Sequence, residues 1–440
     1  MDLEFHLVGQ ASKRGLIPRL PSGSQLLETA ERWIRGACPE VVRSSRRTDD
    51  TTAGSELRVG LHPAAPDVVL TADAAGRVTA RAVTSPAGPG FHTFACGLLH
   101  QLGSELDIGW APLGAPGGSV DPTGFFASTE RRDAERVALG WLGATLARAA
   151  EDRRRGSPTI HLGTPGGVRY EVDGALATPL GPRDDAWLAR AAGDPRVAVD
   201  LWPWFADVMD GRYLMQRALC LMWTAVRWRR PSDAAERAEI DEALRQLHRA
   251  YQLDPSLSYP WREWLELLEL AGSSSAMAGP IAERAAAVDP ATPPIGYRRQ
   301  PVTIVQAGWE LTIPGSFAER RTADGWWGSE SGRRIALAAT RAGTSAGPMS
   351  AEALLDQVAG HLGSSALHHQ AGEVMGRARI ATDDRSGVST GVVEGYAAVR
   401  GSGAVIRVEF DDPGDWQWAL DQWRSLRPAG APRSLALAGA

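Results

Sequence analysis

The chain has 440 residues, of which 43% are hydrophobic and 22% are charged, and its formal net charge is −5. Domains average roughly 100–200 residues, so this length predicts two or three of them. A composition this close to the globular average excludes a largely disordered chain. The slightly acidic balance argues against a general nucleic-acid binder, which usually carries a basic domain or stripe.

The basic residues and the cysteines indicate origin and compartment. Lys13 is the only lysine, and together with abundant Ala, Gly and Pro this bias is typical of a GC-rich bacterial genome. Cys38, Cys96 and Cys220 are dispersed, which fits a reducing compartment better than a disulfide framework. The N-terminal residues show no signal-peptide pattern, and no window approaches about 18 uncharged apolar residues. We therefore expect a cytoplasmic protein with no membrane partner.

The first 200 or so residues mix strand and helix patterns. Helices are expected at 25–36 (behind Ser24 as the candidate cap), 91–106 and 131–154. Short strands are expected at 3–8, 57–61, 68–72, 77–84, 159–162 and 168–172. No element is predicted for the polar stretch 43–55. The pattern favours an α/β or α+β organisation without fixing the strand order.

From about residue 201 the strand signals vanish, and helices are expected over 212–228 and 234–253. The fragment AYQLDP at 250–255 matches AAAVDP at 285–290. A helix-ending Ala-x-x-apolar-Asp-Pro at this interval resembles tetratricopeptide repeats, whose period is about 34 residues. The resemblance covers about 80 residues, fewer than three repeats, so it implies a unit that docks on a neighbouring domain. An ordinary pair of helical hairpins is the alternative.

Beyond the Pro-rich linker 290–301 the pattern changes again. Strands are expected at 309–313, 326–330, 334–340, 378–382, 391–399 and 404–410, and helices over 350–362 and 415–426. The sequence GWELTIPGSF at 308–317, the central Ala/Leu-rich helix, the late strands and a closing helix with Trp416, Trp418 and Trp423 resemble the PsbP-like family. That resemblance implies an antiparallel sheet flanked by helices. Members of the family mostly act as accessory, folding or assembly factors, so it also implies protein interaction more than chemistry.

These patterns together predict an α+β multidomain protein. Its expected parts are an N-terminal α/β domain of unknown type over 1–200, a Trp-rich helical, tetratricopeptide-like segment over 201–295, a PsbP-like domain over 300–428, and a flexible tail over 429–440.

The main chemical pattern lies on the helix expected at 91–106. His92, Cys96 and His100 follow one another at intervals of four residues and share one helical face. Adjacent members could pair in hydrogen-bond or metal geometry, but positions 92 and 100 are about 12 Å apart along an ideal axis, too far for one ion. A Cys–His nucleophile would need an orienting third group, for which Asp107 and Asp121 are the possibilities. The alternative is that Cys96 packs as a small apolar residue and the histidines line an ordinary surface.

The other motifs give weaker indications of a catalytic, metal or nucleotide site. The glycine-rich stretch 163–167 lacks the GK[ST] ending of a phosphate loop and predicts a hairpin connection. His361, His368 and His369 have no carboxylate or cysteine pattern that would complete a metal site. The sequence contains no HExxH, GxSxG, Walker or nucleotide-binding motif. We expect neither a metal site nor a cofactor.

Tryptophan is the second unusual signal, with 16 in the chain. Six of these residues are candidate partner-binding residues: Trp202, Trp204, Trp223, Trp228, Trp261 and Trp264. Trp and Arg are enriched at interface hot spots, but large rings also fill the cores of helical modules. Both interpretations stay open.

The modular organisation and the lack of a catalytic set favour a non-enzymatic intracellular adaptor or assembly protein. Its expected setting is a bacterial multi-protein system of the conflict or secretion type, with a protein partner. The alternative is an enzyme, a hydrolase or transferase, with a Cys/His site near His92, Cys96 and Asp121. Nucleic-acid binding is disfavoured by the net charge, and a small-molecule ligand is left open.

Overall fold

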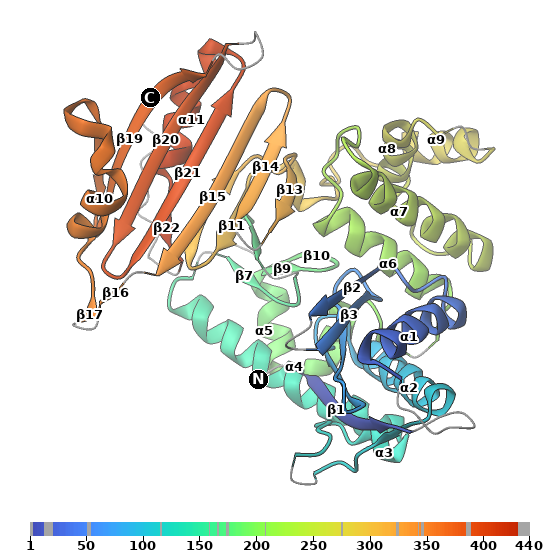
Figure 1. Ribbon diagram of the computed structural model, residues 1–440. Coiled ribbons are helices and arrows are strands. Elements are labelled where there is room, and N and C mark those ends of the chain that lie inside the picture. Colours follow the sequence, from blue (N-terminus) through green and yellow to red (C-terminus); the bar gives the residue numbers. More distant parts are fainter. Residues whose placement is uncertain are drawn as a thin grey trace. The chain divides into compact units, whose positions relative to one another are not determined.

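A computed structural model of the chain describes residues 3–12, 21–50, 54–114, 117–157, 159–164, 167–172, 176–206, 208–273, 276–322, 325–341, 343–344, 347–383 and 389–429. The chain divides into two compact units. Unit 1 consists of Met1–Pro165, Val172–Val226 and Arg237–Gly296, and unit 2 consists of Gly166–Glu171, Arg227–Glu236 and Tyr297–Ala440. Both units contain helices and mainly antiparallel strands, which confirms the α+β class (Figure 1). The finer domain assignments stay predictions.

Unit 1 is built on a six-stranded sheet whose strand order is β2-β3-β4-β5-β1-β6, with every neighbouring pair antiparallel. The strands are β1 (Glu4–Ala11), β2 (Ser44–Asp50), β3 (Gly54–Gly60), β4 (Val68–Ala72), β5 (Arg77–Val83) and β6 (Ile108–Trp110). Helices α1 (Gly23–Ala37) and α2 (Pro89–Leu106) pack against this sheet and against each other. The short α3 (Phe125–Ser128) follows in the chain and contacts α2.

Two expectations for this part of unit 1 were wrong: Ser24 as the cap of the first helix, and the lack of any element over 43–55. Helix α1 is capped by Ser22, whose hydroxyl accepts from the Gln25 N–H while the Gln25 side chain accepts from the Ser22 N–H. Ser24 lacks a Glu or Gln three residues later, so it cannot form this reciprocal pair. The polar stretch 43–55 contains β2, an edge strand paired with β3 from Ser44 to Asp50. An edge strand needs no apolar alternation, which is why the sequence does not reveal it.

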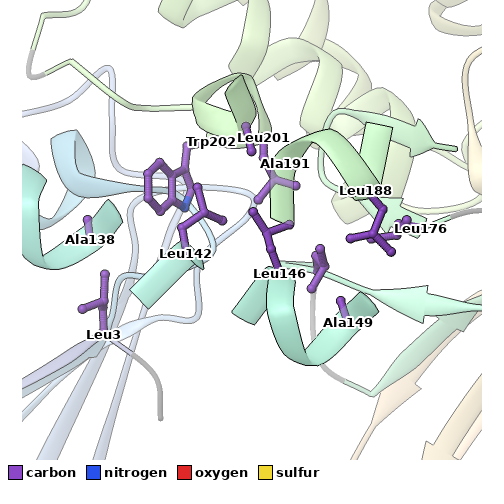
Figure 2. Packing of buried hydrophobic residues seen from close by; sticks show 12 residues of the cluster. Leu3, Ala138, Leu142, Leu146, Ala149, Leu176, Leu188, Ala191, Leu201 and Trp202 are labelled. Carbon is purple, nitrogen blue, oxygen red and sulfur yellow. The ribbon is translucent and has the colours of Figure 1, made fainter. Parts of the chain in front are cut away.

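A second core in unit 1 forms around α4 (Arg131–Arg154), α5 (Asp185–Gly193) and the 3-10 helix Pro195–Leu201, beside the small sheet of β7 (Ile160–His161), β9 (Leu176–Thr178) and β10 (Gly181–Arg183). Figure 2 shows Leu142 and Leu146 of α4 among Leu188, Ala191 and Trp202. Trp202 is fully buried here, and its ring N–H donates to the carbonyl of Ser85, 2.8 Å away.

The rest of unit 1 is helical, with no strand among the described residues between 201 and 295. Its helices are α6 (Gly211–Thr224), α7 (Ala234–Leu253), α8 (Trp261–Ala271) and α9 (Ala278–Ala286). The two matching fragments, 250–255 and 285–290, each follow the end of a helix with the same kind of turn. The Asp254 carboxylate accepts from the Ser256 N–H and the Asp289 carboxylate from the Ala291 N–H, so each Asp-Pro step begins an Asx turn.

The segment that leads into these helices lies directly against the start of α2. The Gly90 N–H donates to the carbonyl of Trp204, and the Trp204 N–H donates to the carbonyl of Ala87. A Cβ atom at Gly90 would lie 2.3 Å from the carbonyl oxygen of Ala206, and one at Gly88, where φ is +108°, would lie 2.8 Å from Trp202. Only glycine permits this approach, so the Gly-Pro-Gly turn lets the helical part dock.

A buried guanidinium forms a second connection between the helices and the sheet. Arg217 of α6 is 1% exposed and donates to Glu242 of α7, to the Tyr213 hydroxyl, and to the carbonyls of Val41 and Leu61. Arg43 binds the other Glu242 oxygen at 2.9 Å. Burial raises the pKa of Glu242, but the two arginines outweigh burial and hold that pKa below its usual value.

Unit 2 contains a seven-stranded antiparallel sheet of order β13-β14-β15-β21-β20-β19-β18. Its strands are β13 (Ala318–Arg321), β14 (Trp326–Glu330), β15 (Arg333–Arg341), β18 (Leu367–Ala371), β19 (Val374–Asp383), β20 (Thr390–Val399) and β21 (Ser402–Phe410). A four-stranded sheet has the order β22-β12-β11-β8, with β8 (Val168–Tyr170), β11 (Val302–Gln306), β12 (Trp309–Ile313) and β22 (Arg427–Pro428). A two-residue pair, β16 (Gly343–Thr344) and β17 (Gly347–Pro348), completes the strands of this unit.

Two helices pack on opposite faces of the seven-stranded sheet. Trp423 of α11 (Trp416–Arg424) lies over Gly376 and Gly395, where a Cβ atom would come within 3.0 and 2.4 Å of its ring. Helix α10 (Ala351–Ala359) packs on Tyr396 and Ala398, whose side chains point to the other face. In Figure 1, α10 lies beside β19 at one end of the sheet, and β13 forms the other end.

The Glu242 cluster yields a stability prediction. Glu242→Gln leaves the Arg217 charge buried without its carboxylate, which should reduce the free energy of unfolding by about 3–5 kcal/mol. Urea unfolding of the full chain measures this loss. The matched control is Asp241→Asn, which breaks the half-exposed Arg237–Asp241 pair one residue earlier and should cost less than about 0.5 kcal/mol. Equal losses in both variants would contradict the assignment.

Candidate functional site

The structure brings three of the four sequence-predicted site residues, His92, Cys96 and Asp121, together on the buried side of helix α2. His92 and Cys96 lie on the first two turns of that helix, and Asp121 lies in the loop between β6 and α3. The ligating atoms of these three side chains lie within 4.8 Å of one another, and all three residues are buried. Among the described residues this is the one group of three His, Cys, Asp or Glu side chains with spacing suited to a metal ion.

The geometry centres on the Nε2 atom of His92. Thr123 Oγ1 lies 2.9 Å from it, Asp121 Oδ1 3.2 Å and Cys96 Sγ 3.6 Å. The other ring nitrogen, Nδ1, lies 2.9 Å from the hydroxyl of Thr84. The Phe5 ring meets the imidazole edge-on at 5.7 Å. Both ring nitrogens therefore have protein partners, and the ring is fixed between the helix and the sheet.

The backbone of the loop orients Asp121. Its Oδ1 accepts from the N–H and hydroxyl of Thr123, and its Oδ2 accepts from the N–H of Phe126. Burial raises the pKa of the carboxyl, but hydrogen bonding and charge from His92, with the loop donors, lower it to about 2. Asp121 is thus ionised over the whole physiological range.

The environment of Cys96 shifts its pKa in the opposite direction. It is fully buried, and burial followed by the nearby Asp121 charge raises the pKa of its thiol well above the ordinary value. A cysteine nucleophile needs a lowered pKa and access to substrate. In a Cys–His–Asp triad the thiol and the carboxylate also approach different ring nitrogens, whereas here both approach Nε2. The arrangement does not suit nucleophilic catalysis.

The fourth sequence candidate lies apart from this cluster. The His100 ring stacks on Phe126 with centroids 4.2 Å apart, and its Nε2 approaches the Phe126 carbonyl. Asp107, the other orienting residue considered, ends α2 with φ at +53°. Neither residue is among the partners of the His92 ring. The i, i+8 spacing alone predicts this separation.

The six candidate tryptophans contribute mainly to packing. Trp202, Trp204 and Trp264 are at most 2% exposed, and Trp223, Trp228 and Trp261 are partly buried. Trp204 lies 4.3 Å from Tyr213 and 4.9 Å from Phe94 between ring centroids. The three fully buried rings have no surface to offer a partner in this conformation.

A surface that sequence reasoning missed lies in unit 2. One row of cross-strand neighbours runs Arg320, Trp327, Ala336, Arg407 over strands β13, β14, β15 and β21. This row lies on the same face of the sheet as α10, but α10 packs at the opposite end of that face. Trp327 is 53% exposed, whereas its neighbour Trp326 is fully buried on the opposite face. The Trp326-Trp327 pair in an alternating strand is the sequence signal that could have located it, because one of two adjacent residues must point outward.

This face is hollowed and carries arginines. A cavity of about 520 Å³ is lined by Trp327, Ala336 and the side chains around them. Arg334 and Arg407 both bind Glu409, at 2.8 and 2.7 Å. Arg320 is exposed and forms no ion pair with any residue that the structure describes. The hollow thus combines an exposed indole with an available positive charge.

The remaining motifs do not assemble into a site. The stretch 163–167 lies partly outside the described residues. His368 and His369 are consecutive in β18, so their side chains point to opposite faces, and His361 contacts Tyr396 and Glu394. No helix in the described part of the chain is long and apolar enough to cross a membrane.

Comparisons with known proteins add little. No protein-family model matches the chain, and no curated protein matches it. A crystal structure of a protein from Bacteroides thetaiotaomicron VPI-5482, at 1.50 Å resolution, aligns at 10% sequence identity with a TM-score of 0.24. The alignment covers 28% of this chain and 45% of that one, so this chain spans less than half of its length. Similarity at this level carries no argument about fold or function.

The environment of Cys96 yields a reactivity prediction. With iodoacetamide near neutral pH, Cys96 in the folded protein should react far more slowly than free cysteine and become fully labelled only after unfolding in urea. Peptide mass spectrometry of timed samples measures the rate at each cysteine. Partly exposed Cys38 serves as the internal control. Labelling of Cys96 faster than free cysteine would restore it as a candidate nucleophile.

Proposed function

We propose that this protein is a non-enzymatic adaptor or assembly protein, and that it binds a partner protein through the hollowed face of the seven-stranded sheet in unit 2. The exposed indole of Trp327 next to the guanidinium of Arg320 carries the proposal. Trp and Arg together are the residues most enriched at interface hot spots. The exposed ring also offers apolar area that a partner side chain can cover.

The proposed partner presents an extended acidic segment. Arg334 and Arg407 pair with Glu409 and, respectively, with Asp411 and Asp383. The arginine of the hollow without an ion pair to a described residue is Arg320, in a lining that also contains Asp233 and Glu319. A carboxylate of the partner would pair with Arg320, and an adjacent apolar side chain would cover Trp327. The row from Arg320 to Arg407 crosses four strands, which suits a segment laid across the sheet.

The family resemblances support the same proposal. An antiparallel sheet with helices on both faces is the layout implied for PsbP-like proteins, whose members mostly serve as accessory or assembly factors. The matching Asx turns after α7 and α9 support tetratricopeptide-like repeats in the helical part. We further propose that the protein acts in the bacterial cytoplasm within a multi-protein system of the conflict or secretion type.

The proposal is tested with a tagged full-length chain and three variants. Trp327→Ala and Arg320→Glu each alter the proposed surface, and Trp416→Ala removes a ring that is 48% exposed elsewhere in the same unit. Peptides selected from a random display library on the wild-type protein should be rich in Asp and Glu. Their Kd, measured by fluorescence anisotropy, should rise about 10-fold or more in Trp327→Ala and Arg320→Glu.

The matched control, Trp416→Ala, should bind the same peptides with a Kd within about twofold of the wild-type value, because Trp416 lies outside the hollow. A partner from the native host should likewise co-purify with wild type and Trp416→Ala but not with Trp327→Ala. Binding that is equal in all variants, or selected peptides without acidic residues, would contradict the proposal.

A further inference from the structure

The surroundings of His92 Nε2 contain more partners than a neutral imidazole nitrogen can use. That atom has either one lone pair or one hydrogen, so it can satisfy one hydrogen bond. Three groups nevertheless approach it within 3.6 Å: the Thr123 hydroxyl, the Asp121 carboxylate and the Cys96 thiol. A buried nitrogen, a carboxylate oxygen and a sulfur converging in this way form the donor set of a metal centre.

Hydrogen bonds on the far side of the ring select the tautomer that a metal ligand needs. The Thr84 hydroxyl donates to the carbonyl of Leu3, so it accepts from the Nδ1–H of His92. With a proton held on Nδ1, Nε2 is the ring atom that faces Cys96 and Asp121. Without an ion it donates its hydrogen to the Thr123 hydroxyl, which in turn donates to Asp121, and a bound ion would replace that hydrogen. Fixing a ligating histidine through its other nitrogen is the usual arrangement around protein-bound metals.

Asp121 is oriented in the same manner. Its carboxylate accepts from the backbone N–H groups of Thr123 and Phe126 and from the Thr123 hydroxyl. The oxygen that faces His92 is therefore fixed before any ion arrives, and little side-chain entropy is lost on binding.

The two separations from Nε2 match those of a tetrahedral zinc site, and all three ligand atoms lie within 4.8 Å of one another. With Zn–N, Zn–O and Zn–S bonds near their normal lengths, tetrahedral geometry places a nitrogen and an oxygen ligand about 3.3 Å apart and a nitrogen and a sulfur ligand about 3.6 Å apart. The separations are 3.2 Å from Nε2 to Asp121 Oδ1 and 3.6 Å from Nε2 to Cys96 Sγ. The Thr123 hydroxyl, 2.9 Å from Nε2, donates to Asp121 Oδ1 and so orients the carboxylate beside the proposed ion.

We propose that His92 Nε2, Cys96 Sγ and Asp121 Oδ1 bind one Zn²⁺ ion that stabilises unit 1. On binding, the Cys96 thiol and His92 Nε2 each give up a proton to the buffer, and the S–H and N–H bonds are replaced by Zn–S and Zn–N bonds. The side chains of His92 and Asp121 are at most 1% exposed, so no substrate reaches the ion and its function is structural. The ion ties the loop at 121–123 to helix α2.

The test uses the full chain, stripped with a chelator and then titrated with Zn²⁺ against a chromophoric competitor. Wild type should bind one equivalent, and its Tm should rise by roughly 5 °C or more with excess metal. Co²⁺ in place of Zn²⁺ should produce the near-ultraviolet charge-transfer band that reports a thiolate ligand. The Cys38→Ser variant should keep both the stoichiometry and the band.

Cys96→Ala and Asp121→Asn should lose the high-affinity equivalent and the Tm rise, and Cys96→Ala should also lose the cobalt–thiolate band. Circular dichroism in the presence of chelator checks that these variants fold. If Asp121→Asn does not fold, Cys96→Ala still decides, because alanine keeps the small apolar volume beneath α2. Wild type that binds no stoichiometric metal, or a thiolate band that persists in Cys96→Ala, would overturn the proposal.

Discussion

The architecture of unit 1 depends on one buried guanidinium. Arg217 is 1% exposed, and each of its donors meets an acceptor drawn from α6, α7 or the loops beside β2 and β3. Removing that charge from water is costly, and only a complete set of partners offsets the cost. The helical segment and the first sheet must therefore adopt one relative position, in which Glu242, Val41 and Leu61 all face the same side chain.

This constraint explains how the aromatic residues are used. Once the helices dock on the sheet, the segment at 202–206 crosses the start of α2, and Trp202 and Trp204 become core residues. Two of the six tryptophans noted in the sequence, Trp202 and Trp204, therefore belong to an internal contact of unit 1. Trp327, the indole that we propose for partner binding, is in unit 2, beside an arginine on an incompletely covered sheet face. The proposed function therefore assigns stability and recognition to different tryptophans.

Sequence patterns predicted many of the regular elements, because these depend on local periodicity, but no strand was expected at β9, β11, β13 or β18. Helices α4 and α7 have the bounds expected for them, 131–154 and 234–253, and β4 matches the expected 68–72. Long-range pairing was not predictable: β2 is defined by its partner β3, and β1 lies between β5 and β6.

The candidate site could be predicted only in part, because it too combines a local pattern with a long-range contact. The helix period placed His92 and Cys96 together, but only the return of the chain after β6 selects Asp121 over Asp107. Whether a tryptophan points inward or outward depends on which helices cover the sheet, and no local pattern contains that information.

The most direct measurement is native-state hydrogen exchange of the full chain over a denaturant series, resolved by peptide mass spectrometry. If Arg217 and Trp204 join the helices to the sheet, the core amides of α6 and α7 open with the same free energy and denaturant dependence as those of β3–β5. Opening of α6 to α9 at a clearly lower free energy, while the sheet of unit 1 stays protected, would contradict the account.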